Sequence, residues 1–185
     1  MRPSKLIMCA LMSVFVGTGL VGFFAPSVMA DDTLASFKGG IAVIPVTSGV
    51  GTAATAEVVN RNIVRGVQPA VAIWVIRNLE AKVRTNGDIK VEGEGLLFAS
   101  SAPALSLDDI GGTGGDFVFA TLICEAAAPF TEHNSNLNGV PLDPNGNFRI
   151  DDVLSDAPTT CDSPVLLIRN AANMNWFAAG IPAKN

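Results

Sequence analysis

The chain has 185 residues and a formal net charge of −5 at pH 7, with 12 basic residues (Lys and Arg) against 17 acidic residues. The basic residues form no cluster, which makes nucleic acids and anionic membrane surfaces poor candidate partners. After the first thirty residues no stretch is long and apolar enough to span a bilayer, and the length suits one domain with one hydrophobic core.

The first thirty residues have the pattern of a secretory signal peptide. Arg2 and Lys5 give a positively charged start, an apolar run covers residues 6–24, and residues 28–30 offer small side chains for a cleavage site. Cleavage would leave residues 31–185 as a single β-rich domain, and loss of the two basic residues would change the net charge from −5 to −7. The leader predicts a secreted or extracytoplasmic protein, in the periplasm or at the cell surface. A retained membrane anchor is the weaker alternative, because glycines interrupt the apolar run.

Beyond the leader, short runs alternate apolar and polar residues and are separated by clusters of Gly, Pro, Asn and Asp, which is typical of an all-β domain. Residues 53–65 differ, because Val58, Val59 and Ile63 would share one helical face. This segment is predicted to be a short helix or irregular. In chain order, the predicted strands cover residues 41–47, 71–76, 79–84, 89–94, 117–124, 164–169 and 175–181.

The clearest prediction is a β-hairpin formed by residues 79–84 and 89–94. Cross-strand partners must lie on the same face of a sheet. A three-residue loop of residues 85–87, with its glycine in the left-handed conformation, satisfies this condition by placing Val83 opposite Ile89. A two-residue loop would place the strands out of phase.

Residues 142–148 predict a second hairpin, with a Pro-Asn-Gly turn at its tip. Its strands would pair Leu142 with Phe148 and Val140 with Ile150. Together with the first hairpin, this favours a two-sheet sandwich of about seven or eight strands. A small β-barrel is the alternative.

The strand at 117–124 is apolar on both faces, so it is expected in the middle of the fold, covered from both sides. Residues 100–116 are expected to form a mobile loop. Cys124 and Cys161 are the two cysteines left after the leader, and an oxidising compartment predicts a disulfide between them. Two buried free thiols are the alternative, and a zinc site is disfavoured because only the distant His133 could add a histidine ligand.

Two segments resemble calcium-binding loops, and each has a simpler explanation. Residues 111–119 fit a glycine-rich calcium nonapeptide, but a single copy has no neighbouring turn to stack on. Residues 143–154 begin like an EF-hand loop, but Phe148 stands where glycine is needed and Leu154 where the closing glutamate is needed. No metal site and no cofactor are predicted.

No catalytic constellation is evident. Glu92 and Glu94 lie about 7 Å apart on one strand face, a separation compatible with glycoside hydrolysis, although a solvated strand face explains them equally. His133, the only histidine, is expected in an exposed polar loop without a nucleophile beside it. Trp74 and Trp176 either form a carbohydrate-stacking platform or, as is usual in a small β domain, belong to the core.

Four stretches, at residues 60–69 (NRNIVRGVQP), 73–76 (IWVI), 120–124 (ATLIC) and 175–180 (NWFAAG), together resemble a family of small exported bacterial proteins that remain uncharacterised. The resemblance implies an exported β-rich domain with a Cys pair. It implies no activity, substrate or site residue.

The sequence therefore favours a non-catalytic extracellular binding or surface-associated module with an unknown extracellular ligand. A secreted hydrolase acting on glycans through surface carboxylates is the alternative, and a self-associating structural matrix protein is the third. Arg65, Trp74 and Asp151 are positions at which mutation is informative, without being assigned to a site.

Overall fold

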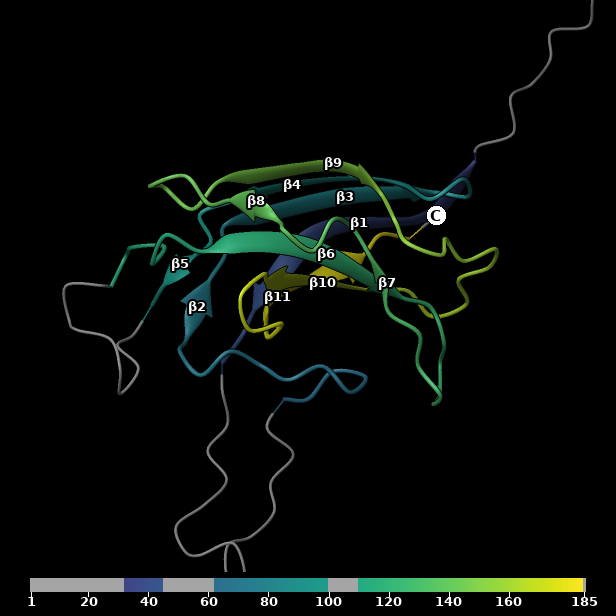
Figure 1. The fold of residues 1–185 in the computed structure, drawn as a ribbon, viewed down its shortest axis with the longest axis horizontal. Coiled ribbons are helices and arrows are strands. Elements are labelled where there is room, and N and C mark those ends of the chain that lie inside the picture. The colour runs from purple at the N-terminus through teal and green to yellow at the C-terminus, as the bar shows by residue number, and fades with distance from the viewer. Residues whose placement is uncertain (1–31, 45–61, 100–109, 185) are drawn as a thin grey trace, which may run out of the picture. The chain divides into compact units, whose positions relative to one another are not determined.

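The computed structural model describes residues 32–44, 62–99 and 110–184 (Figure 1). The leader at 1–30 and residues 45–47 of the first predicted strand lie outside this range. So do residues 53–61 of the segment predicted to be a short helix or irregular, and residues 100–109 of the predicted loop. Within it the structure is all-β, as predicted, and contains no helix. The strands are β1 (Thr33–Ala42), β2 (Trp74–Val75), β3 (Asn78–Arg84), β4 (Asp88–Glu94), β5 (Leu97–Phe98), β6 (Phe117–Ile123), β7 (His133–Asn134), β8 (Val140–Pro141), β9 (Phe148–Val153), β10 (Val165–Asn170) and β11 (Trp176–Pro182).

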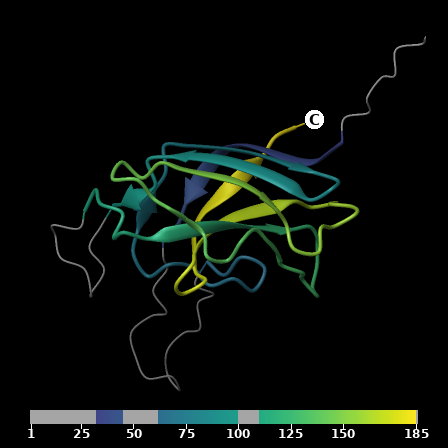
Figure 2. The same ribbon diagram turned by 45° about the horizontal axis from the view of Figure 1, so that its top comes forward.

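Nine of these strands form one antiparallel sheet in the order β7-β6-β10-β11-β1-β3-β4-β9, with β8 also paired to β6. The sheet curls, so that β3, β4 and β9 lie on one side and β6 and β10 on the other, with the core between them (Figures 1 and 2). The layers expected from the sequence are therefore two halves of one curled sheet. β2 and β5 form a small second sheet.

Hydrogen bonds near β7 and β9 bring the two ends of the curled sheet together. The amide of Ser155, just after β9, donates to the carbonyl of Asn134 in β7 at 2.8 Å, and the amide of Asn134 donates to Ser155 Oγ at 3.1 Å. The amide of Asn136 donates to the Asp152 carboxylate at 2.7 Å. These contacts replace part of the backbone pairing that an open sheet edge lacks.

The burial pattern of the strands follows from their position in the curled sheet. β3 and β4 alternate strictly between buried and exposed residues, because one face meets the core and the other meets solvent. β6 differs, since its six residues after Phe117 are all buried. The prediction that this strand is covered on both faces is confirmed.

The first hairpin has the predicted register and loop. Val83 pairs with Ile89, and both are fully buried. Gly87 has φ +89° and its amide donates to the Arg84 carbonyl at 3.0 Å, so glycine supplies the left-handed position at the tip.

The turn of the second hairpin is confirmed, but its strand pairing is wrong. The Asp143 amide donates to the Asn147 carbonyl at 3.0 Å, which closes the turn. Val140, however, pairs with Val118 of β6, whereas Ile150 pairs with Val91 of β4. The turn therefore connects β8, which pairs with β6 in one half of the sheet, to β9, which pairs with β4 in the other half. The residues of the turn do not determine which strands the two flanking segments pair with.

One further prediction needs correction, because β1 begins at Thr33 and ends at Ala42, so the strand predicted at 41–47 is placed too late. β2, within the strand predicted at 71–76, pairs with β5 in the same register in which β3 pairs with β4, and it therefore extends the first hairpin upstream. Of the segment predicted to be a short helix or irregular, residues 62–65 are described and are irregular, and Val64 forms a bridge with Val67 across a tight turn.

We expect Gly93→Ala to destabilise the protein by about 1–3 kcal/mol, the cost of overpacking. Gly93 lies opposite Phe148, and a Cβ at this position would lie 2.1 Å from the buried ring of that residue. Urea unfolding measures the effect. The substitution should cost less in a Phe148→Leu background, where the obstructing ring is absent, and an equal cost in both backgrounds would contradict the steric explanation.

Candidate binding face

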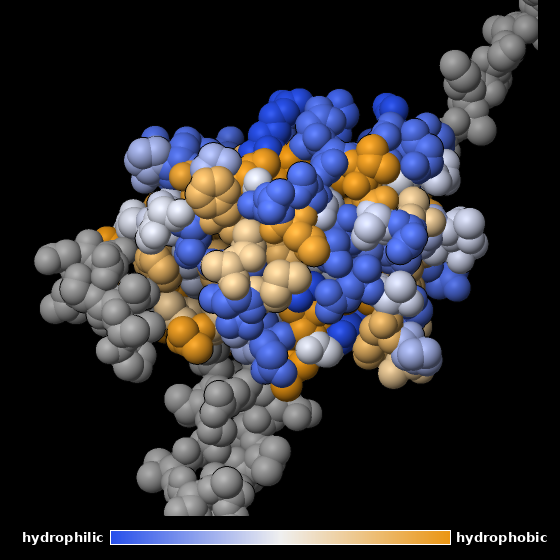
Figure 3. Space-filling model, viewed as in Figure 1, coloured by the Kyte–Doolittle hydropathy of each residue, from blue (hydrophilic) through white to orange (hydrophobic). Residues whose placement is uncertain are grey.

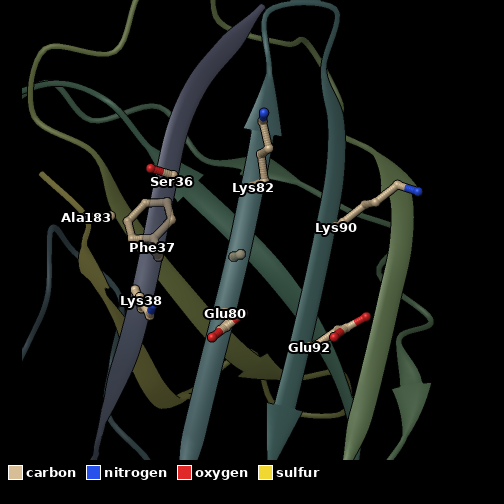
Figure 4. A pocket seen from close by; sticks show the side chains of 9 residues that line it. Ser36, Phe37, Lys38, Glu80, Lys82, Lys90, Glu92 and Ala183 are labelled. Atoms are coloured by element: carbon tan, nitrogen blue, oxygen red, sulfur yellow. The ribbon is translucent and has the colours of Figure 1, made fainter. Parts of the chain in front are cut away.

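The outer surface of β1, β3, β4 and β9 carries polar side chains that the strand register aligns in two rows. Each row crosses the four strands in that order. The glutamate row consists of Lys38, Glu80, Glu92 and Arg149, and the lysine row consists of Ser36, Lys82, Lys90 and Asp151. We call these eight residues the charged face, and Figure 4 shows its members on β1, β3 and β4.

Each row places two like charges directly opposite each other at its centre. Glu80 pairs with Glu92, and Lys82 pairs with Lys90, so that each pair lies at one level across β3 and β4 (Figure 4). Like charges in directly opposed positions are unfavourable in a sheet. The arrangement is tolerated only where opposite charges lie close by.

β9 supplies opposite charges to β4. Arg149 donates to the carboxylate of Glu92, and Lys90 Nζ lies 3.2 Å from Asp151 Oδ2. Glu92 and Lys90 nevertheless keep 61 % and 58 % of their side-chain surface exposed. Exposed ion pairs of this kind contribute about 0–1 kcal/mol each, so they do not prevent these side chains from meeting further charges.

A wide, shallow hollow of about 340 Å³ opens in the charged face. Lys38, Lys82 and Ala183 are among the residues that line it, whereas Phe37 and Ala81, which also border it, have residue exposures of 3 % and 8 % and belong to the core. In the space-filling view, hydrophilic side chains gather along the side of the molecule where β9 and β4 lie (Figure 3). The face therefore combines exposed charges with a shallow, open hollow.

The two carboxylates predicted as a candidate catalytic pair form ion pairs with two different arginines. Glu92 is paired with Arg149, and Glu94 lies 3.4 Å from the guanidinium of Arg77. Both carboxylates are exposed. An acid for glycoside hydrolysis needs an apolar surrounding that keeps its proton, and these exposed ion pairs do not provide one.

His133 is buried, so its predicted exposure is wrong. It lies in β7, pairs with Leu122 and has a residue exposure of 6 %. In the described part of the chain its Nδ1 has no hydrogen-bond partner. The polar neighbours of His133 in the sequence gave no sign of this, because the burial results from β7 pairing with a distant part of the sheet.

Both tryptophans belong to the core, as is usual in a small β domain, and form no exposed platform. Trp74 has a residue exposure of 2 % and stacks on Phe177 with 4.0 Å between ring centroids. Trp176 is also buried, and its indole N–H donates to the carbonyl of Asn62 at 3.0 Å.

The aspartates of the two calcium-like segments accept hydrogen bonds from the chain itself. The amides of Asn145 and Asn147 both donate to Asp143 at 2.8 Å, and the backbone hydrogen bond from Asn147 is the largest cause of a lowered pKa at Asp143. Asn170 donates to Asp116 at 2.7 Å. Among residues 32–44, 62–99 and 110–184, no group of three or more His, Cys, Asp or Glu side chains could hold a metal ion.

The predicted disulfide between Cys124 and Cys161 is present. Arg65 supports the same corner of the fold, donating to the carbonyls of Ile123 at 3.0 Å and Ser163 at 2.7 Å. Its guanidinium also lies over the Phe130 ring, 5.7 Å from the centroid. Arg65 is therefore a structural clamp that ties the segment before β2 to the ends of β6 and β10.

A second arginine has a role that was not predicted. Arg169 is buried in β10, forms an ion pair with Glu132 and donates to the Met174 carbonyl at 2.8 Å. Its guanidinium lies 5.3 Å from the centroid of the Phe119 ring. A lone charge inside the apolar run at 165–170 was the available signal, since a buried charge requires partners.

Within the described residues, no helix is long and apolar enough to cross a membrane. No family model matches the chain, and neither a curated protein nor a solved structure matches it.

We expect removal of the disulfide to lower the free energy of unfolding by about 3–4 kcal/mol, the chain-entropy value for a loop of this length. The two cysteines are 37 residues apart. Urea unfolding of Cys124→Ser/Cys161→Ser, compared with the oxidised protein, measures the loss. Reductant should shift the oxidised protein and leave the double variant unchanged, whereas a shift in both would assign the effect to another cause.

We expect Asp116 to make the protein more stable as the pH falls from neutral toward 4. Burial raises the pKa of Asp116 above its ordinary value of 3.8, an effect that the hydrogen bond from Asn170 partly offsets. The folded state thus binds this proton more tightly than the unfolded state, and the unfolding free energy rises on acidification through the folded pKa.

Comparison of the wild type with Asp116→Asn by urea unfolding at several pH values isolates this contribution. Any stability advantage of the variant should shrink as the pH falls. Asp143→Asn is the matched control of opposite sign, because the pKa of Asp143 is lowered and its contribution is lost in acid. A difference between wild type and Asp116→Asn that does not change with pH would contradict the prediction.

Proposed function

We propose that this protein is an exported, non-catalytic module that works outside the cytoplasm by binding, and that the charged face is its binding surface. The observation that carries the proposal is the register of β1, β3, β4 and β9, which aligns exposed charges of both signs in two rows. A binding surface needs exposed groups in fixed relative positions, and a paired sheet provides them.

Three features support export. The leader has a charged start, an apolar run and a cleavage site. The disulfide suits an oxidising compartment. The resemblance to small exported bacterial proteins points in the same direction.

The spacing of the charges indicates what kind of partner would fit the charged face. Neighbouring strands are about 4.8 Å apart, and residues two apart on a strand are about 6.7 Å apart. Like charges therefore lie side by side at the centre of each row, and opposite charges follow each other along β3 and β4. This pattern fits a partner that carries both signs of charge, and it disfavours a uniform polyanion or polycation.

The hydrolase alternative has less support. It depends on Glu92 and Glu94, which are both exposed and paired with arginines. Glu80 lies opposite Glu92 on the neighbouring strand, but it too is on the exposed face, next to Lys38 and Lys82.

Fractionation of bacterial cells that express the full chain tests the proposal. We expect the exported protein to begin at Asp31 by intact-mass analysis and to be recovered outside the cytoplasm in a cross-linkable complex that about 0.5 M salt dissociates, because salt screens exposed charges. The variant Glu80→Lys/Glu92→Lys should be exported equally and should form several-fold less of this complex.

A control variant, Glu125→Lys/Asp162→Lys, changes the net charge by the same amount away from the charged face. It should form the complex like the wild type. An uncut chain inside the cell would contradict export, and equal amounts of the complex for all three proteins would contradict the assignment of the face.

A further inference from the structure

We propose that the partner of the charged face is a second copy of this chain, docked face to face through a two-fold axis. This inference rests on the proposed binding role of the face and identifies what binds there. It follows from the order of charges within the two rows.

A two-fold axis lying between the rows and parallel to them would place each row of one copy over the other row of the second copy. Such an axis keeps every residue above its own strand, so that β3 faces β3 and β4 faces β4, in opposite directions. The glutamate row reads positive, negative, negative, positive from β1 to β9, and the lysine row reads neutral, positive, positive, negative. The two patterns are complementary at every charged position of the lysine row.

The pairs across the interface follow directly. Glu80 of one copy would face Lys82 of the second, Glu92 would face Lys90, and Arg149 would face Asp151. The symmetry repeats each pair, which is the property of an isologous interface. Three complementary contacts thus become six without any like-charge contact between the copies.

The first position of each row, on β1, also fits this arrangement. Lys38 of one copy would lie over Ser36 of the other, beside the hollow that Ala183 borders. Ser36 is small and uncharged, so it leaves room for the long side chain of Lys38, whose ammonium group remains in water.

Two observations favour a copy of this chain over an unrelated partner. First, like charges lie opposite each other at Glu80 and Glu92 and at Lys82 and Lys90, an unfavourable arrangement in a sheet. The facing rows would add opposite charges to those that β9 already supplies to Glu92 and Lys90. Second, the four basic and three acidic residues of the face sum to +1, whereas the chain carries −5. Two copies can therefore approach through this face without concentrating their net negative charge.

Analytical ultracentrifugation of the purified exported protein at about 0.05 M and 0.5 M sodium chloride tests the association. We expect a monomer–dimer equilibrium at low salt, with a dissociation constant that rises at least about tenfold at high salt, because the contacts are exposed ion pairs. A protein that stays monomeric at low salt up to millimolar concentration would overturn the inference.

Charge reversal tests the facing pairs themselves. Glu80→Lys/Glu92→Lys makes the centres of both rows positive, and Lys82→Glu/Lys90→Glu makes both negative, so each variant alone should be monomeric at low salt. An equimolar mixture should form a heterodimer, because every central contact is again between opposite charges. Failure of the mixture to associate, or dimers of either variant alone, would overturn the inference.

The control Glu125→Lys/Asp162→Lys should dimerise like the wild type, and circular dichroism should show the same β signal for all four proteins. Failure of the dimer and failure of the proposed function are distinguishable. A salt-sensitive complex at the charged face that contains a different molecule refutes only the second copy as partner, whereas a dimer that is never exported refutes only the extracytoplasmic role.

Discussion

The register of the hairpin formed by β3 and β4 is the constraint on which the rest of the structure depends. Gly87 adopts the left-handed conformation at the tip and thereby sets Val83 opposite Ile89. Because side chains alternate with a period of two, a slip of one residue would bring the charged residues of one strand into the core and expose its apolar residues. The conformation of Gly87 thus sets both which side chains of β3 and β4 are buried and which charged side chains lie opposite each other.

The opposite half of the curled sheet is stabilised by different means. β6 is buried on both faces, so chain segments outside the sheet must cover its outer face. The disulfide at Cys124 and the hydrogen bonds of Arg65 hold such segments against the end of β6. The buried guanidinium of Arg169 forms an ion pair with Glu132, which lies just before β7. This half of the sheet is therefore stabilised by a disulfide and by charged contacts, whereas β3 and β4 are stabilised by burial of the apolar residues on one face. The other face of β3 and β4 stays open to solvent.

What the sequence could predict depends on whether the determining contact is local. The first hairpin was predictable, and its register already implies the opposed pairs of Glu80 with Glu92 and of Lys82 with Lys90. β1 was placed too late because a bulge between Phe37 and Gly40 interrupts its alternation. The burial of His133 and the partner of Val140 depend on strands distant in the sequence, for which no local pattern exists. The flanking positions of the charged face, on β1 and β9, were hidden for the same reason.

The order of charges on the charged face matters more to the proposal than their number. The two rows are complementary to each other, with Arg149 and Asp151 extending the pattern onto β9, the edge strand of this half of the sheet. Charged side chains on an edge strand discourage uncontrolled edge-to-edge pairing. If the face binds a partner as proposed, the fixed order of its charges would make that recognition both specific and sensitive to salt, because a partner in another register would meet like charges.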